Sequence, residues 1–240
     1  MITTQALFIE QPYARAVEAR VLGRTAEGGL ILDRTIFYPT GGGQPGDSGR
    51  LTWAGGEIAI ATTIKGEGGA LILLPAEPSP LPPLGSVITQ TLDWERRHRL
   101  MRVHTALHLL SVVMAYPVVG GQIGEAKGRL DFHLPTPPED LAAMETALNR
   151  LIGMGLEVST RWITAEDLAA QPELVKTIYA RPPVGKGPVR LVQIGAEDAP
   201  IDLQPCGGTH VENTREIGPV RLGKLENKGR DTRRMSLHLG

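Results

Sequence analysis

The sequence of 240 residues has little cysteine and few aromatic side chains: Cys206 stands alone, beside 3 Phe, 4 Tyr and 3 Trp. A single cysteine excludes an intramolecular disulfide framework, so we expect a cytoplasmic protein. No apolar run approaches the ~20 residues of a membrane-spanning helix, and no basic and then apolar leader opens the chain, so no membrane partner is expected. With so few aromatics, base stacking is not expected to dominate contacts with a single strand.

Net charge is nearly absent as well, with 25 Lys+Arg against 26 Asp+Glu. The total of −1 excludes a uniformly basic protein, but it hides an uneven distribution. Residues 93–102 carry four arginines against two acids, residues 220–240 six basic side chains against two acidic ones, and residues 139–173 seven acids against two arginines. The hydrophobic content of 41% excludes wholesale disorder.

Arginine outnumbers lysine 19 to 6, which suits bidentate contacts with phosphate. For either basic cluster taken alone, a solvated surface of mixed charge is the alternative. The candidate RNA-binding side chains in these two clusters are Arg96, Arg97, Lys228, Arg230, Arg233 and Arg234.

Residues 1–92 show strand and turn signals that predict a small β-barrel or sandwich as a first domain. Expected strands are 16–22, 30–32, 57–64, 71–74 and 86–92, with glycine pairs between several of them. Residues 75–85 include five prolines and predict a stiff, extended segment. An interdomain linker is one interpretation; a loop within the first domain is preferred, because another strand follows it.

Residues 93–240 predict a second, α+β domain with a mostly antiparallel sheet. Asp93 is the expected N-cap of a first helix that ends before Pro117, with apolar residues at helical spacing: Leu100, Val103, Leu107, Leu110 and Met114. A second helix is expected to start at Thr136, with a Thr136–Glu139 capping box and a buried stripe of Leu141, Met144, Leu148 and Leu151 before Gly153. Expected strands are 157–163, 189–194, 220–225 and 232–239.

Two short pairs of side chains predict a zinc site. His104 and His108 lie four residues apart, which places both imidazoles on one face of a helix, and Cys206 precedes His210 by the same spacing in a glycine-containing loop. The alternatives are two packed, hydrogen-bonded histidines and a cysteine that acts as a small apolar side chain. About a hundred residues separate the pairs, so this is not a zinc finger, and the loop favours an open site.

A third motif is the sequence FYPTGGGQPGD at residues 37–47. The three glycines Gly41, Gly42 and Gly43 permit a close approach of backbone N–H groups to an anion. Because no Gly-Lys-Ser/Thr follows, this is not a nucleotide P-loop. A tight loop of the barrel is the other interpretation.

Together, HTALH at 104–108, CGGTH at 206–210 and the FYPTGGGQPGDSG loop resemble the editing domain of alanyl-tRNA synthetase. The flanking sequences LDWERRHRLMRVHTALHLL and VENTREIGPVRLGKLENKGRDTRR agree, and the resemblance covers nearly the whole chain. No aminoacylation domain is expected before Met1. The chain therefore resembles the freestanding alanyl-tRNA editing proteins of the AlaX family, in their medium-length form.

That resemblance implies a translation-factor type of barrel followed by the editing fold shared with threonyl-tRNA synthetases. It implies hydrolysis of the ester that joins serine, with glycine as a second candidate, to alanine tRNA, while Ala-tRNA(Ala) is spared. A mischarged aminoacyl-tRNA is thus the expected partner, Zn²⁺ the expected cofactor, and Gln122 an expected active-site residue.

Selectivity has a physical basis in this reaction. A pocket for alanine cannot firmly reject serine, whereas a second site that hydrogen-bonds the hydroxyl can reject alanine. Thr40, Thr105 and Gln122 are candidates for reading serine, and the N–H groups of residues 41–43 for stabilising an oxyanion. The ion is catalytic if a coordination position stays open and structural if all four side chains ligate it. An inactive zinc-containing tRNA-binding module and a zinc hydrolase of small esters or amides remain rival functions.

Overall fold

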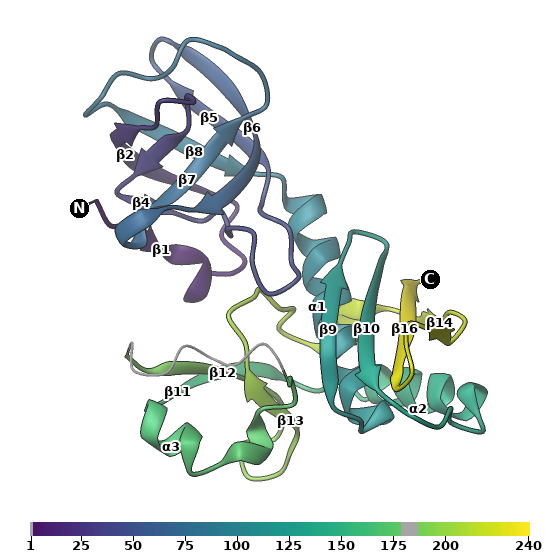
Figure 1. The fold of residues 1–240 in the computed structure, drawn as a ribbon. Helices are drawn as coiled ribbons and strands as arrows, with labels where there is room; N and C mark the ends of the chain where they lie inside the picture. Colours follow the sequence, from purple (N-terminus) through teal and green to yellow (C-terminus); the bar gives the residue numbers. More distant parts are fainter. Residues whose placement is uncertain (1, 179–186) are drawn as a thin grey trace. The chain divides into compact units, whose positions relative to one another are not determined.

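A computed structural model describes residues 2–178 and 187–240, in two compact units, Met1–His98 and Arg99–Gly240 (Figure 1). The predicted boundary after residue 92 falls at the end of strand β8 (Val87–Leu92), whereas the observed division lies inside helix α1 (Trp94–Met114). The first turn of α1 belongs to the first unit because Trp94 packs against the apolar core of that unit and Arg97 is buried within it.

The first unit contains the predicted barrel. Its strands close in the order β2-β3-β7-β6-β5-β8, and every pair of neighbours is antiparallel. Beside it, β1 (Gln5–Ala6) pairs in parallel with β4 (Arg34–Thr35), next to the short 3-10 helices η1 (Leu7–Ile9) and η2 (Glu67–Gly69). The other barrel strands are β2 (Ala16–Arg24), β3 (Leu30–Leu32), β5 (Gly49–Trp53), β6 (Gly56–Lys65) and β7 (Leu71–Pro75).

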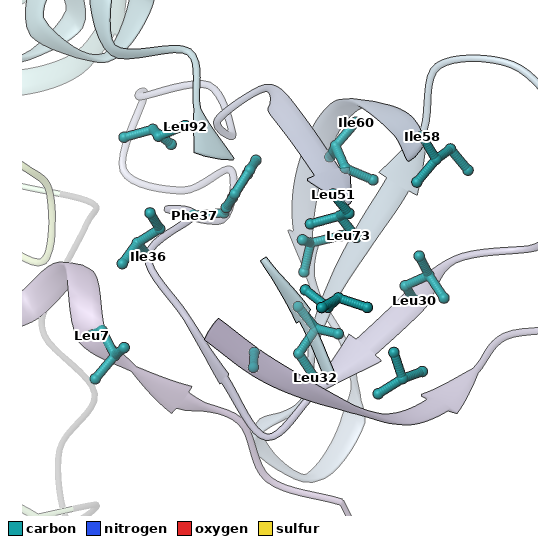
Figure 2. Packing of buried hydrophobic residues seen from close by; sticks show 13 residues of the cluster. Leu7, Leu30, Leu32, Ile36, Phe37, Leu51, Ile58, Ile60, Leu73 and Leu92 are labelled. Carbon is teal, nitrogen blue, oxygen red and sulfur yellow. The ribbon is translucent and has the colours of Figure 1, made fainter. Parts of the chain in front are cut away.

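Alternation of side chains along the strands creates the interior of this barrel. Buried and exposed residues alternate in β2 and β6, as expected where one sheet face meets a core and the other meets water. Figure 2 shows the packed interior, to which Leu30, Leu51, Ile60 and Leu73 contribute fully or almost fully buried side chains. Strand β5 was not predicted, because its only fully buried apolar residue is Leu51.

The proline-rich segment lies between β7 and β8, which are both strands of the barrel. The prediction of a loop within the first domain is therefore confirmed. Side chains of β2 hold this loop: Arg20 donates to the carbonyl of Gly85 at 2.6 Å, and Arg24 to that of Leu81 at 3.2 Å.

The second unit contains two antiparallel sheets, which confirms the α+β expectation. One sheet has the order β14-β16-β10-β9, with β15 also paired to β16, and the other the order β11-β12-β13. The strands of the first are β9 (Val118–Ile123), β10 (Lys127–His133), β14 (Val220–Leu222), β15 (Glu226–Asn227) and β16 (Thr232–Leu239). Those of the second are β11 (Val158–Ile163), β12 (Val189–Gly195) and β13 (Pro200–Pro205).

Four strands of this unit, β9, β10, β13 and β15, were not predicted. Glycines interrupt the apolar pattern of β9 and β10, and prolines begin and end β13. The short helices α3 (Ala165–Ala169), η3 (Pro172–Leu174) and η4 (Thr214–Ile217) complete the described part of the unit.

Helix α1 has the predicted apolar stripe, whose five residues are all buried. It approaches β10 closely: a Cβ at Gly128 would lie 2.6 Å from Val103 and 2.9 Å from Leu107. This contact requires glycine at position 128. Among the described residues, none of the helices is long and apolar enough to span a membrane.

The expected start of the second helix is wrong. Helix α2 (Leu141–Gly153) has Asp140 as its N-cap, which accepts a hydrogen bond from the N–H of Ala143 at 2.8 Å. A start at Thr136 with a Thr136–Glu139 capping box fails because the consecutive prolines 137 and 138 disfavour the helical conformation of the residues before them. The buried residues of α2 are Leu148 and Ile152, while Leu141, Met144 and Leu151 of the expected stripe are half-buried.

Arg97 is not a surface residue, contrary to its predicted role in RNA binding. Its side chain is 0% exposed and its Nε lies 3.0 and 2.9 Å from the two carboxylate oxygens of Asp47. The guanidinium also donates to the carbonyls of Ile36 and Pro12, and Asp47 accepts from the N–H of Tyr38 at 2.6 Å. These bonds tie the segment around the glycine loop to the start of α1.

We expect Arg97→Met to lower the free energy of unfolding of the first unit by about 3–5 kcal/mol, because it leaves a buried carboxylate unpaired. Urea denaturation followed by tryptophan fluorescence measures this, since Trp53 and Trp94 lie in this unit. The matched control is Arg50→Met, which breaks the exposed Arg50–Glu57 pair and should cost less than about 1 kcal/mol. Equal midpoints for the two variants would contradict the structural role of Arg97.

Candidate metal centre

The two predicted pairs of side chains meet in the second unit. His104 and His108 project from one face of α1, and Cys206 and His210 come from the loop that follows β13. One candidate ligand atom from each of the four residues lies within 4.8 Å of the others. The three histidines are buried and Cys206 is half-buried, so the cluster has one side nearer to solvent.

The spacing of the cluster suits a metal ion. The Cys206 Sγ lies 3.5 Å from His104 Nε2 and 3.3 Å from His210 Nε2. A tetrahedral zinc ion, with bonds of about 2.0–2.3 Å, sets its nitrogen and sulfur ligand atoms roughly 3.3–3.7 Å apart. One thiol and three imidazoles are also a donor set that zinc prefers. The four residues can therefore hold an ion of this kind.

Thr105 holds His210 in the orientation that such an ion needs. The Thr105 hydroxyl donates to the carbonyl of Met101 at 3.0 Å, so its only proton is used. At 3.1 Å from His210 Nδ1, it therefore accepts the proton of that nitrogen and leaves Nε2 facing Cys206. Because it also accepts from the N–H of Val211, the expectation that Thr105 reads a substrate hydroxyl is wrong.

Asp202 has the corresponding role for His108. Its Oδ2 lies 2.8 Å from His108 Nδ1 and accepts the proton of that nitrogen, so Nε2 is the free ligand atom. Arrangements of this kind orient metal-binding histidines and raise their basicity. Asp202 is 2% exposed, and we did not predict it, because a single aspartate in a strand carries no motif.

The charges inside the ion-free cluster favour a thiolate. Although burial raises the pKa of the Cys206 thiol, the charge of His104 lowers it well below the ordinary value. For His108, burial lowers the pKa. The hydrogen bonds to Asp202 and Cys206 outweigh this effect and raise the pKa to about 9. Burial and the charge of His104 lower the pKa of His210 to about 3. The thiolate and a neutral His210 are thus ready to ligate, whereas His108 must first lose a proton.

Arg190 supports the loop that carries Cys206. From β12, its Nη1 donates to the carbonyls of Cys206 at 3.1 Å and Gly208 at 2.8 Å, and the N–H of Cys206 returns a bond to the Arg190 carbonyl at 3.2 Å. Arg190 was not among the predicted site residues. An arginine inside a mostly apolar strand, VRLVQIG, is the signal that could have identified it.

The structure does not bring the side chain of Gln122 to this cluster. Gln122 lies opposite Arg129 in the β9–β10 pair, and Arg129 donates to its Oε1 at 3.2 Å. Gly128, the neighbour of Arg129, faces α1, and successive residues of a strand face opposite sides. Gln122 therefore lies on the face of the sheet away from α1, where it is exposed.

In the first unit, the triple glycine forms a tight hairpin turn. The backbones of Gly41 and Gln44 exchange two hydrogen bonds of 3.0 Å, and Gly42 and Gly43 have φ values of +57° and +83°. Positive φ at both central residues is typical of a type I′ turn and explains why both are glycine. The N–H of Gly41 is used in the turn, so the expectation that it binds an oxyanion is wrong. The exposed Thr40 accepts from the N–H of Gly46 at 2.8 Å.

Two of the basic side chains predicted to bind RNA form ion pairs with acidic side chains. Arg234 makes two bonds to Asp131, at 2.7 and 3.0 Å, and Lys228 pairs with Glu226 at 2.6 Å. Although burial raises the pKa of Asp131, hydrogen bonds from Arg234 and Arg129 hold it below its usual range.

Three other candidates, Arg96, Arg230 and Arg233, differ in their surroundings. Arg233 bonds to Asn227 Oδ1 at 2.8 Å and to backbone carbonyls, Arg96 donates to the Gly46 carbonyl at 2.8 Å, and Arg230 is exposed. Arg233 and Arg230 are therefore the strongest candidates for phosphate contacts in residues 220–240.

Comparisons with known proteins identify chains and family models that this chain resembles. Residues 189–236 match the family model of the "Threonyl and Alanyl tRNA synthetase second additional domain", and residues 4–96 that of "tRNA synthetases class II (A)". The chain is 34% identical to the alanyl-tRNA editing protein AlaX-M of Saccharolobus solfataricus, over 97% of both chains, and 33% identical to that of Methanosarcina barkeri, also over 97% of both. It is 36% identical to the alanine–tRNA ligase of Pyrobaculum arsenaticum over 93% of this chain, but it spans only 25% of the length of that ligase.

We expect metal uptake to release protons and to strengthen as the pH rises toward about 9, because His108 must lose the proton that its raised pKa retains. Above that value the dependence should flatten. Titration of the ion-free protein with zinc in two buffers of different ionisation enthalpy measures the proton release. His108→Ala should lose the pH dependence and most of the affinity, whereas His133→Ala, outside the cluster, should change neither. Uptake that is indifferent to pH would contradict ligation by His108.

Proposed function

Because the chain belongs to the AlaX-M family of alanyl-tRNA editing proteins, we propose that it is a zinc-dependent hydrolase that deacylates mischarged Ser-tRNA(Ala) and spares Ala-tRNA(Ala). Gly-tRNA(Ala) is a second candidate substrate. The observation that carries the proposal is the four-ligand cluster, complete in a chain that matches relatives of this name from end to end.

Zinc is the proposed ion because the donor set combines one thiolate with three imidazoles. His104, His108, Cys206 and His210 would hold it, with Asp202 and Thr105 fixing two of the rings. When bound, such an ion supplies Lewis acidity, which polarises a carbonyl or lowers the pKa of a water molecule. We propose that the aminoacyl end of the tRNA approaches the cluster from the side of the half-buried Cys206.

The substrate ester itself limits what the protein must supply. An aminoacyl ester is already reactive, so positioning a water molecule and the ester accounts for much of the required acceleration. The leaving group is the ribose hydroxyl at the end of the tRNA.

Serine selectivity requires a group that hydrogen-bonds the serine hydroxyl. Thr105 is already occupied, and Gln122 lies on the face of the sheet away from α1. The exposed Thr40, in the first unit, stays a prediction of the sequence analysis. Its hydroxyl donates to the Thr63 carbonyl at 3.3 Å and accepts from the N–H of Gly46. Because alanine lacks the serine hydroxyl, a site that bonds this hydroxyl would be left with an unpaired polar group by alanine.

The deciding experiment is a deacylation assay on Ser-tRNA(Ala) and Ala-tRNA(Ala), with and without a chelator. We expect the serine ester to be hydrolysed in preference to the alanine ester by about a hundredfold or more, since a site that bonds a hydroxyl rejects its absence strongly. Chelation and His104→Ala should abolish the activity, and zinc should restore it to the chelated protein. His133→Ala should match the unmodified protein.

Three outcomes would overturn this proposal. If the protein hydrolyses neither aminoacyl-tRNA, it is not the proposed hydrolase. If it then still binds tRNA tightly, the chain is an inactive tRNA-binding module. Cleavage of small free esters without preference for tRNA identifies a general zinc hydrolase. Full activity after complete metal removal contradicts the zinc dependence.

We further propose that residues 220–240 contact tRNA phosphates through Arg233. Arg233→Ala should weaken tRNA binding and lower the slope of log K against log salt by about one, as expected for one lost phosphate contact. The control is Arg161→Ala, an exposed arginine in the acidic segment 139–173, which should change neither quantity. Filter binding at several salt concentrations measures both. An unchanged slope for Arg233→Ala would refute this surface.

A further inference from the structure

A lysine outside every motif reaches the carboxylate that supports the metal centre. Lys176 follows η3, and its Nζ forms an ion pair with Asp202 Oδ1. The other oxygen of the same carboxylate, Oδ2, lies 2.8 Å from His108 Nδ1. Asp202 thus bridges Lys176 and one of the four candidate ligands.

The contacts of Asp202 fix the plane of its carboxylate. Oδ2 also accepts a bond from Gln204 Nε2 at 2.8 Å, so each of the two oxygens has at least one donor. The side chain of Asp202 is 0% exposed, and that of Lys176 is 26% exposed. A carboxylate buried to this degree needs a positive partner and complete hydrogen bonding to remain in place. Lys176 is the partner that meets this need from outside the cluster.

The same network returns to the backbone of α1 at His108. Gln204 Nε2 lies 3.4 Å from Ser111 Oγ, and the Ser111 hydroxyl donates to the carbonyl of His108 at 2.7 Å. The ring of His108 is therefore held through Asp202, and its backbone through Ser111. Both sets of bonds meet at the pair of side chains from β13, Asp202 and Gln204.

Lys176 is itself anchored through its backbone. The N–H of Val118, at the start of β9, donates to the Lys176 carbonyl at 2.9 Å, and the N–H of Ile178 donates to the Val118 carbonyl at 2.9 Å. Thr177 forms a parallel bridge with Val118 between these two bonds. This lysine therefore extends from a fixed point of the sheet toward Asp202, unlike a lysine on a mobile surface loop.

From this geometry we propose that Lys176 is a positioning residue of the metal centre: it holds Asp202 so that Asp202 orients His108 Nε2 toward the other three ligands. Lys176 is not one of the four candidate ligands. The inference rests on one part of the proposed function, namely that the cluster binds a metal ion. It adds a residue that lies 30 positions before the first residue of CGGTH, between η3 and β12, where sequence motifs gave no indication of a role.

The test is the zinc affinity of Lys176→Met, measured by competition with a chromogenic chelator, together with the visible spectrum of the cobalt-substituted protein. We expect the affinity to fall by about 10–100-fold, as for other changes to groups that support metal ligands, and the cobalt bands to shift because His108 is no longer held. Lys176→Arg retains a cation and should recover most of the affinity. Lys127→Met, at an exposed lysine of the same unit, is the matched control and should behave as the unmodified protein.

Affinity within about twofold of the unmodified protein and an unchanged cobalt spectrum for Lys176→Met would overturn the proposal. So would a lower melting temperature with normal zinc binding, because that result is a merely structural effect. If Lys176→Met does not fold by circular dichroism, Asp202→Asn tests the same link, and normal zinc binding by that variant also overturns it.

Deacylation by the unmodified protein, measured in parallel, separates the two proposals. Zinc binding that depends on Lys176, without any deacylation, supports this inference and rejects the proposed function. Deacylation together with zinc binding that is independent of Lys176 supports the proposed function and rejects this inference. An unmodified protein that binds no zinc overturns the inference directly.

Discussion

The close contact between α1 and β10 determines the geometry of the metal centre. Because a side chain at position 128 would clash with Val103 and Leu107, glycine there lets the helix lie directly on the sheet. With this face of α1 buried, His104 and His108, on the neighbouring face, are directed toward the loop after β13. Tight packing of one helical face thus determines where the other face presents its imidazoles, because successive side chains of a helix have fixed angular positions.

Around the cluster, the candidate ligands are held by a second layer of polar side chains rather than by packing alone. Thr105 accepts a hydrogen bond from Nδ1 of His210, and Asp202 accepts one from Nδ1 of His108. Arg190 donates to two carbonyls of the loop that carries Cys206. These supporting groups are almost completely buried, so each hydrogen bond is made where water cannot replace it. A cluster of three imidazoles and a thiol would otherwise have several orientations of similar energy.

The chain also shows how charge counted along a sequence differs from charge presented by a surface. Arg97, in the basic run before HTALH, forms the buried pair with Asp47 and stabilises the first unit from within. Arg234 and Lys228, in the basic C-terminal segment, have acidic partners on the same or a neighbouring strand. Counting charges in a window cannot separate these cases, because the partner of Arg97 lies 50 residues away.

The sequence by itself determined the elements and motifs whose signals are local. Five of the six barrel strands, α1 with its apolar stripe, and the two ligand pairs within HTALH and within CGGTH follow from periodicity, turn residues and ligand spacing, all of which operate over a few residues. Only the tertiary structure decided that Thr105 supports a histidine, that Gln122 lies on the face of the sheet away from α1, and that Asp202, Lys176 and Arg190 belong to the centre. Those roles depend on contacts between residues far apart in the chain, and no periodicity or spacing encodes them.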